Sequence, residues 1–168
     1  MSAWDSTGLS PKDQPRFDYV NRDQIPEELK EVFDSIVGSQ RGVGTLSNGA
    51  LPGPFNGWMY TDPEMARALD GIGMAVRSNT SNVPKTMKEV AICVIGAHFR
   101  SNVEFWAHSR IALAAGVRQE VLDSIYNSEK PSFSDNGEEP FQKAAYDMTM
   151  EYLCLLYTSD AADEWLRG

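Results

Sequence analysis

The sequence predicts an all-α protein, a single-domain bundle of about six helices, from three observations. Apolar residues recur at helical spacing in several segments, with capping or helix-ending residues at the segment borders. No segment alternates apolar and polar residues over the length of a strand, and no internal repeat is present. The chain has 168 residues, 42% of them hydrophobic, which suits one globular domain with a sizeable core.

Charge and composition exclude several classes of function. The formal net charge of −9 is spread along the chain without a basic stripe, so nucleic acid and anionic membrane surfaces are poor partners. The longest apolar run, "VAICVIGA", is too short to span a bilayer, and the N-terminus lacks the pattern of a secretory signal. Cys93 and Cys154 form neither a CxxC nor a disulfide framework. We therefore expect a cytoplasmic protein without nucleic-acid or membrane partners.

The first helix is predicted over residues 26–38, after a polar, proline-rich segment that reads as a flexible N-terminal arm over 1–25. Pro26 stands at the start, four apolar residues follow at helical spacing, and Gly38 ends the pattern. Residues 39–58 are rich in Gly, Pro, Ser and Asn and predict a long loop, functional or mobile. Aromatic residues in its second half indicate that this half packs.

The second helix is predicted over residues 61–79. Thr61 and Glu64 have the spacing of a capping box, in which each side chain bonds the other's backbone. Gly71 and Gly73 weaken the middle of the helix but would allow another helix to approach closely.

The third and fourth helices are predicted over residues 83–100 and 101–116. Thr86 and Glu89 again have capping-box spacing, and the segment after them is apolar all round. Periodicity alone does not separate a buried helix from a buried strand here. Gly116 ends the fourth helix.

Two further helices are predicted over residues 118–127 and 138–153. The core-facing side of the last is predicted to comprise Phe141, Ala144, Ala145 and Met148. The run "CLLYTSDAADE" from Cys154 onward resembles the conceptual translation of a transposase-type sequencing-library adapter. We accordingly expect the natural domain to cover 26–153 and residues 154–168 to be a non-native tail.

The stretch "NVEFWAHSRIAL" places an acid and a base on a face that should pack. On a helical wheel, Glu104 and His108 share a stripe with Ile111, Ala112 and Ala115. A carboxylate four residues from a desolvated imidazole favours the protonated imidazole, which is the form a general acid needs.

Simpler interpretations exist for each of these residues. Ser101 and Glu104 have capping-box spacing, so Glu104 would then only close a helix start, as Glu89 would with Thr86. A single buried histidine is more often a hydrogen-bonded core residue than a catalyst. Several polar groups on one apolar stripe are harder to explain this way, because each costs free energy unless it has a partner.

The run "KEVAICVIGAHFRSNVEFWAHSRIALAAGVRQEVLDSI" resembles the core of the carboxymuconolactone decarboxylase family, which includes the alkyl hydroperoxidase D proteins. Upstream, "GPFNGWMYTDPEMARALDGIG" is similar to a segment of the longer decarboxylase-like members. Together these runs place the resemblance over about Pro26 to Tyr152. The resemblance implies an alkyl hydroperoxidase D-like helical fold.

In the peroxidase branch of that family the pattern is a glutamate, a CxxC and a histidine. Glu89 and His108 match the glutamate and the histidine, whereas Ser101 and Glu104 stand where the cysteines would be. Dithiol reduction of hydroperoxides needs a reactive thiolate and a resolving thiol, so peroxidase activity is disfavoured. Cys93 lies on an apolar helix and is expected to be a buried, inert residue.

Resemblance to the decarboxylase branch implies a cofactor-free enzyme that assembles as a homo-oligomer, a trimer or hexamer, and acts on a small molecule. His108 would be the general acid that protonates the carbanion or enolate formed when carbon dioxide leaves the substrate. Glu104 would orient His108, and Glu89 would be the second carboxylate. No metal site is expected, because His98, His108 and Glu104 do not have a recognised ligand spacing. Residues expected to bind the substrate are Ser101, Arg100, Phe105, Phe55 and Trp58, with Arg41 as a further cation.

Two other functions remain open at this stage. A non-catalytic oligomeric protein could keep the fold and bind a small molecule without turning it over. A peroxidase or antioxidant of the alkyl hydroperoxidase D type is the third, disfavoured by the absent CxxC.

Overall fold

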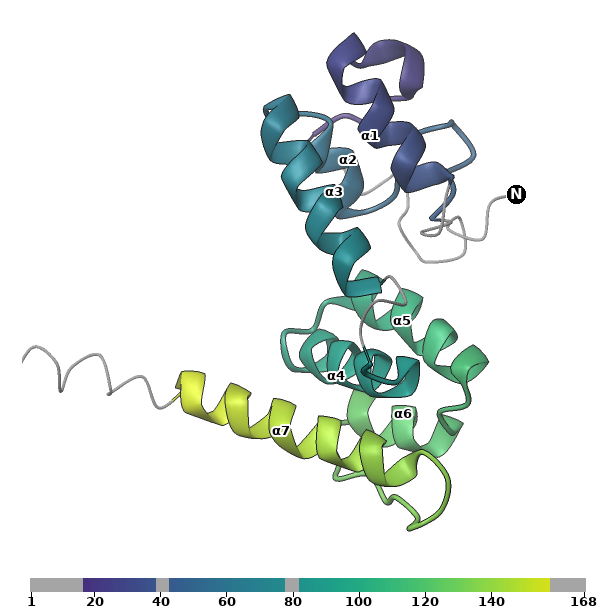
Figure 1. Ribbon diagram of the computed structural model, residues 1–168, viewed down its shortest axis with the longest axis vertical. Coiled ribbons are helices and arrows are strands. Elements are labelled where there is room, and N and C mark those ends of the chain that lie inside the picture. Colours follow the sequence, from purple (N-terminus) through teal and green to yellow (C-terminus); the bar gives the residue numbers. More distant parts are fainter. Residues whose placement is uncertain (1–16, 39–42, 78–81, 158–168) are drawn as a thin grey trace, which may run out of the picture. The chain divides into compact units, whose positions relative to one another are not determined.

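The computed structural model describes residues 17–38, 43–77 and 82–157, which form an all-α structure (Figure 1). The prediction of an all-α fold is confirmed, with seven α-helices and one short 3-10 helix in the described residues. Contacts divide the chain into two compact units, Met1–Asn82 and Val83–Gly168, and each is described by itself. Arg41, the first part of the predicted arm and the end of the predicted tail lie outside the described residues.

The first unit is built on two packed helices and a short connecting helix. Its core comprises eight buried apolar residues, four of them from the predicted helical stripe of the first helix. Ser35 donates a 2.7 Å hydrogen bond to the buried Asp70 carboxylate and so joins the two long helices. The elements are η2 (Arg22–Gln24), α1 (Glu27–Val37), α2 (Pro54–Trp58) and α3 (Pro63–Arg77).

The described end of the predicted arm packs onto this unit. Asn21 caps η2, and Ile25 is buried in the core. The buried amide of Asn56 on α2 accepts a hydrogen bond from the Val20 N–H and donates one to the Asp18 carbonyl. The short helix α2, which the loop-like composition did not predict, therefore holds the N-terminal segment in place.

The start of α3 differs from the predicted capping box. Asp62, rather than Thr61, accepts a 2.8 Å hydrogen bond from the Glu64 N–H, while the Thr61 hydroxyl donates to the Trp58 carbonyl. The predicted close approach at Gly71 is also absent, because an added Cβ there would meet no atom within 4 Å.

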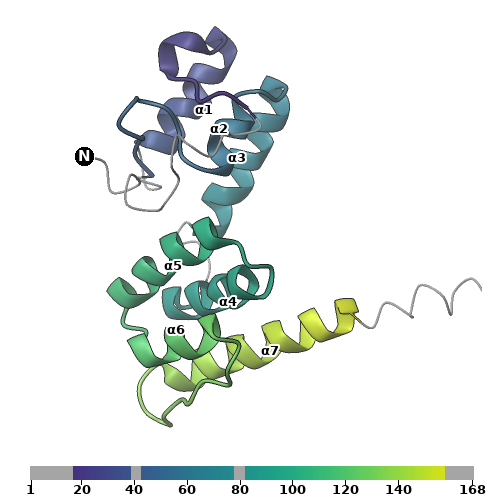
Figure 2. The same ribbon diagram turned by 180° about the vertical axis from the view of Figure 1, so that it is seen from behind.

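The second unit has a central helix, α4, which packs against α5, α6 and α7 (Figures 1 and 2). The apolar segment within residues 83–100, for which periodicity did not separate a helix from a strand, is a helix. Its buried residues face neighbours on several sides. Gly116 ends α5 in the left-handed conformation, as its position predicted. The elements are α4 (Lys85–His98), α5 (Asn102–Ala115), α6 (Gln119–Tyr126) and α7 (Glu139–Tyr157).

The buried side of α7 agrees with the predicted one only at Ala145. Phe141 and Met148 are exposed, and the residues that face the core are Gln142, Ala145, Thr149 and Leu153. Of the predicted residues only Ala145 is buried, because the prediction followed the largest apolar side chains, whereas the buried side of α7 also includes the polar Gln142 and Thr149. The Thr149 hydroxyl satisfies its hydrogen bond within the helix, at the Ala145 carbonyl.

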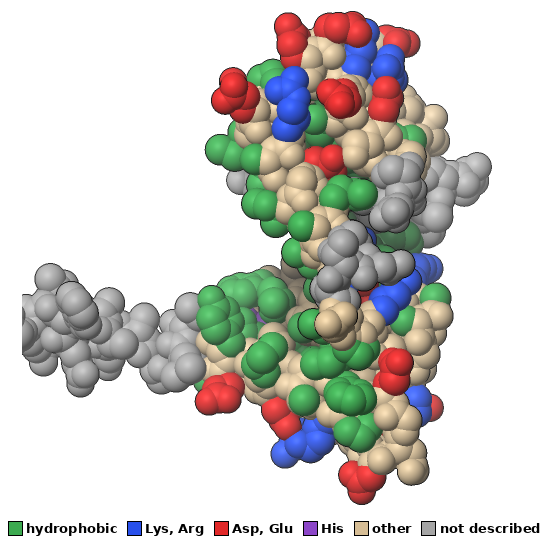
Figure 3. Space-filling model, in the orientation of Figure 1, with side chains coloured by type: hydrophobic (Ala, Val, Ile, Leu, Met, Phe, Trp, Pro, Cys, Tyr) green, Lys and Arg blue, Asp and Glu red, His purple; other side chains and the backbone are tan. Residues whose placement is uncertain are grey.

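Both units leave large apolar side chains at their surfaces (Figure 3). On α3 these include Met65, Ile72 and Val76, and on α7 they include Phe141, Met148 and Tyr152. Among the described residues, no helix is long and apolar enough to cross a membrane.

Two glycine substitutions should change stability in opposite directions. Gly116 has φ +107°, so Gly116→Ala should lower the free energy of unfolding by about 1 kcal/mol because Ala is strained there. Gly71 lies in a helix with open space around it, so Gly71→Ala should raise the free energy of unfolding by about 0.5–1 kcal/mol. Denaturant titration measures the free energy of unfolding of both variants. Stabilisation by Gly116→Ala would contradict the left-handed conformation at the end of α5.

Candidate active site

A tight connection sets the distance between α4 and α5. Arg100 has φ 52°, an uncommon left-handed conformation for a non-glycine residue, and reverses the chain. The Ser101 N–H then donates a 2.8 Å hydrogen bond to the Gly96 carbonyl. A Cβ added to Gly96 would lie 3.2 Å from the Phe105 backbone nitrogen and 3.6 Å from Glu104 Cβ. The first turn of α5 therefore packs directly on the backbone of α4.

This packing brings two carboxylate side chains to one imidazole. His108 Nδ1 lies 2.7 Å from Glu89 Oε2, across the α4–α5 interface. On the opposite side of the ring, His108 Nε2 lies 3.3 Å from Glu104 Oε2, one helical turn earlier on α5. Each ring nitrogen thus faces a different carboxylate.

The two carboxylates differ in their exposure to solvent. Glu89 and His108 are only 6% and 4% exposed, whereas the Glu104 side chain is 48% exposed. The predicted proximity of Glu104 and His108 is confirmed, but the predicted burial of Glu104 is wrong. Glu104 sits in the first turn of α5, at the edge of the interface, where its carboxylate reaches solvent.

The capping interpretation of Glu89 does not hold in the structure. α4 begins after Pro84 without a side-chain cap, and the buried Thr86 hydroxyl donates a 2.6 Å hydrogen bond to Glu138. Ser101, likewise, makes no side-chain cap at the start of α5. Both glutamates are oriented towards His108 instead.

The arrangement can hold and transfer a proton. An imidazolium between two carboxylates donates two charge-assisted hydrogen bonds, which are stronger than neutral ones. The buried Glu89 fixes the ring orientation through Nδ1, so Nε2 is the nitrogen that faces the exposed carboxylate of Glu104. A ring with one nitrogen anchored by a buried carboxylate and the other beside an exposed carboxylate could act as a general acid or base.

The other predicted site residues are placed as follows. Arg100 is exposed, Ser101 is half-buried at the start of α5, and the half-buried Phe105 ring lies 4.9 Å from the Tyr126 ring. Phe55 and Trp58 belong to the first unit, where their rings meet edge to face at 5.0 Å and pack against the core of that unit. The site is therefore built from second-unit residues.

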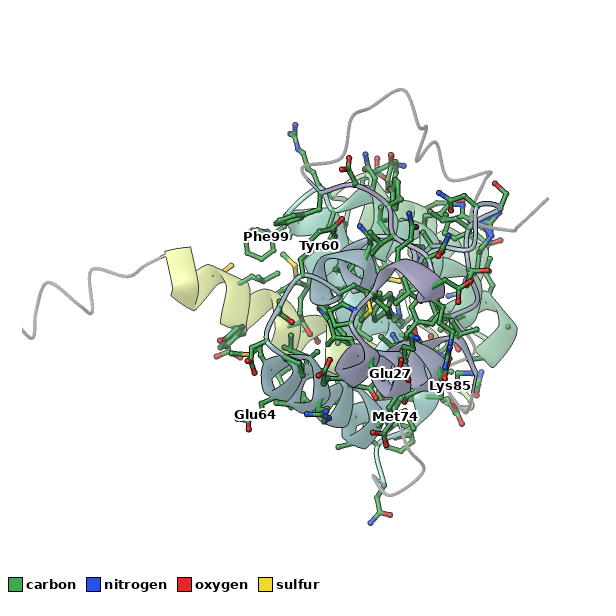
Figure 4. The ribbon with its side chains drawn as sticks, turned by 90° about the horizontal axis from the view of Figure 1, so that it is seen from above. Glu27, Tyr60, Glu64, Met74, Lys85 and Phe99 are labelled. Atoms are coloured by element: carbon green, nitrogen blue, oxygen red, sulfur yellow. The ribbon has the colours of Figure 1, made fainter. Side chains whose placement is uncertain are left out.

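Sequence reasoning missed two residues that shape the site. Gly96 permits the contact between α4 and α5, and a glycine within an otherwise apolar helix was the available signal. Tyr126 contributes the ring next to Phe105, and no sequence pattern linked the two. Phe99, just after α4, is exposed and points away from the packed interior (Figure 4).

Thiol and metal chemistry find little support among the described residues. Cys93 is buried on α4, and burial, with a smaller contribution from the Glu89 charge, raises the pKa of its thiol to about 12. No three His, Cys, Asp or Glu side chains in the described part of the chain are arranged to hold a metal ion. Glu89 and Glu104 bond opposite nitrogens of His108, so their oxygens do not converge on one point.

Comparison of the chain with protein-family models, with curated proteins and with solved structures finds no match.

The two cysteines should react with a thiol reagent at very different rates. Cys93 should react slowly in the native protein at pH 8, because a thiol with a pKa near 12 is almost wholly protonated and is buried. Cys154 is exposed and serves as the internal fast-reacting reference. Kinetics of thiol titration with Cys154→Ser isolate Cys93, and rapid labelling of that variant would contradict an inert buried thiol.

Gly96→Ala should disturb the site through the backbone. The added methyl group would press on the backbone of Phe105 and lower the free energy of unfolding by about 1 kcal/mol or more. It should also lengthen the Glu89–His108 bond, seen as a shift of the His108 side-chain signals in nuclear magnetic resonance spectra.

Gly71→Ala, a helical glycine with space around it, is the matched control and should leave the His108 signals unchanged. Unaltered His108 signals and stability in Gly96→Ala would remove Gly96 from the architecture of the site.

Proposed function

We propose that the chain is a cofactor-free acid–base enzyme that decarboxylates, or otherwise transforms, a small lactone or keto acid. One observation carries this proposal: a buried imidazole is anchored by one buried carboxylate and faces a second, exposed carboxylate. The resemblance of residues 88–125 to the carboxymuconolactone decarboxylase family supports the reaction class. We further propose that the protein acts in the cytoplasm.

The proposed reaction assigns one role to each of the three residues. The carbon–carboxylate bond of the substrate breaks, carbon dioxide leaves, and the electron pair is delocalised into the substrate's conjugated carbonyl. The His108 Nε2–H then protonates the resulting carbanion or enolate, and Glu104 returns a proton from solvent to Nε2. Glu89 holds Nδ1–H throughout and stabilises the imidazolium.

This assignment exchanges the roles expected for the two glutamates. The sequence had suggested Glu104 as the residue that orients His108 and Glu89 as its second partner. Glu89 makes the shorter bond and is buried, which favours it as the positioning residue. Glu104, at the solvent edge, is better placed to exchange protons.

We also propose that the protein is a homo-oligomer, a trimer or hexamer as the family resemblance implies. The apolar residues of α4 are not the support for this proposal, because α4 packs against α5, α6 and α7 of the same subunit. The support comes instead from the exposed apolar residues of α3 and α7, which a neighbouring subunit would remove from water (Figure 3).

His108→Gln should lose most of the decarboxylase activity while the protein stays folded. General acid–base catalysis contributes about a hundredfold to ten-thousandfold, and glutamine cannot supply the proton although it keeps a hydrogen bond. Glu104→Gln should lower the rate and alter its pH profile, because the charge facing Nε2 is removed. The rates are measured with carboxylated muconolactones and with related lactone and β-keto acids.

Glu151→Gln, an exposed carboxylate on α7, is the control for the loss of one negative charge and should keep the wild-type rate. Equal rates for wild type and His108→Gln at equal folded fraction would remove His108 from the mechanism. No turnover of any of these acids by wild type would favour the non-catalytic binding protein.

A further inference from the structure

A cavity of about 100 Å³ lies in the second unit, and its lining includes none of Glu89, Glu104 and His108. It opens between α4, α7 and the turn that follows α6. Its apolar floor comprises Val94, Ala97, Ile125 and Met150. Sites for drug-sized ligands hold about 300–1,000 Å³, and an engineered apolar cavity of about 150 Å³ takes benzene, so this smaller, open cavity would enclose only part of a single ring.

Four polar side chains also line the cavity: His98, Ser128, Glu129 and Tyr146. None of the four makes a side-chain hydrogen bond to another described residue, so their donors and acceptors are open to a ligand or to water. Burial, with a smaller effect of the nearby Asp147 charge, raises the pKa of Tyr146, so its phenol keeps the proton and can donate or accept.

The turn after α6 places two of these residues by a strained backbone. Ser128 has φ 61°, where glycine is the usual residue. Two backbone hydrogen bonds fix the turn. The Glu129 N–H donates to the Ser124 carbonyl at 2.8 Å, and the Ser128 N–H donates to the Ile125 carbonyl at 3.1 Å. The strain is maintained by this bonding, and it brings both side chains to the cavity.

The charge of the lining selects among ligand classes. Glu129 is the one carboxylate among the lining residues, which include no lysine or arginine, and the whole chain carries a net charge of −9. An anionic ligand would be repelled. A cation could be bound by the Glu129 carboxylate and the hydroxyl oxygens of Ser128 and Tyr146, and an aromatic ring such as that of Tyr146 attracts positive charge.

We propose that this cavity binds a small organic amine, in which a ring-sized apolar body carries one protonated ammonium group. The ring lies on the apolar floor, and the ammonium group donates to Glu129 and to the hydroxyl groups of Ser128 or Tyr146. This site is independent of the reaction assigned to His108.

Three probes of nearly the same shape test the proposal: benzylamine, benzyl alcohol and benzoate. Each is titrated into the full chain, and the backbone amide signals of cavity residues are followed by nuclear magnetic resonance. We expect millimolar binding of benzylamine, about threefold weaker binding of benzyl alcohol, and the weakest binding for benzoate, because an exposed ion pair contributes modestly. The signals that move should be those of the cavity.

Glu129→Gln should remove the preference for benzylamine over benzyl alcohol and leave the affinity for the alcohol unchanged. Glu151→Gln, which removes an exposed charge outside the cavity lining, should keep the preference. Ala97→Leu should fill the floor and weaken both ligands. Equal affinities for the three probes, a preference that survives Glu129→Gln, movement of signals away from the cavity, or no binding at the highest soluble concentration would each overturn the proposal.

Discussion

The buried hydrogen bond between Glu89 and His108 is the interaction on which the organisation of the second unit depends. It joins α4 to α5 at 2.7 Å, with both side chains almost fully removed from water. Two ionisable groups in an apolar interface would be strongly destabilising without each other, since removing one partner of such a pair leaves an uncompensated buried charge. The close α4–α5 packing at Gly96 is the condition under which the two side chains can meet.

The same packing creates an asymmetry that the proposed chemistry uses. One nitrogen of His108 is held by a carboxylate in the core, and the other faces a carboxylate that reaches solvent. The nearby thiol of Cys93 does not compete, because its burial raises its pKa to about 12. At this place the imidazole is therefore the group held between a buried and an exposed carboxylate.

The helical fold could be predicted from the sequence because its signals are local: Gly38 and Gly116 end helices where expected, and the stripe of α1 is buried. The buried side of α7 and the partners of His108 depend on tertiary contacts, which local patterns do not reveal. The buried side of α7 follows the fit of Ala145 against α4 rather than the size of Phe141. The helical wheel placed Glu104 beside His108, but spacing within one helix could not show that Glu89, nineteen residues away, makes the shorter bond.

A double-mutant cycle between Glu89 and His108 tests this account most directly. The free energy of unfolding is measured for wild type, Glu89→Ala, His108→Ala and the double variant. If the buried bond joins α4 to α5, each single change should be costly and the coupling free energy should be about 1.5–3 kcal/mol, as expected for a hydrogen bond to a charged group. Additive effects, with a coupling free energy near zero, would show that the two side chains do not interact and would contradict the site described.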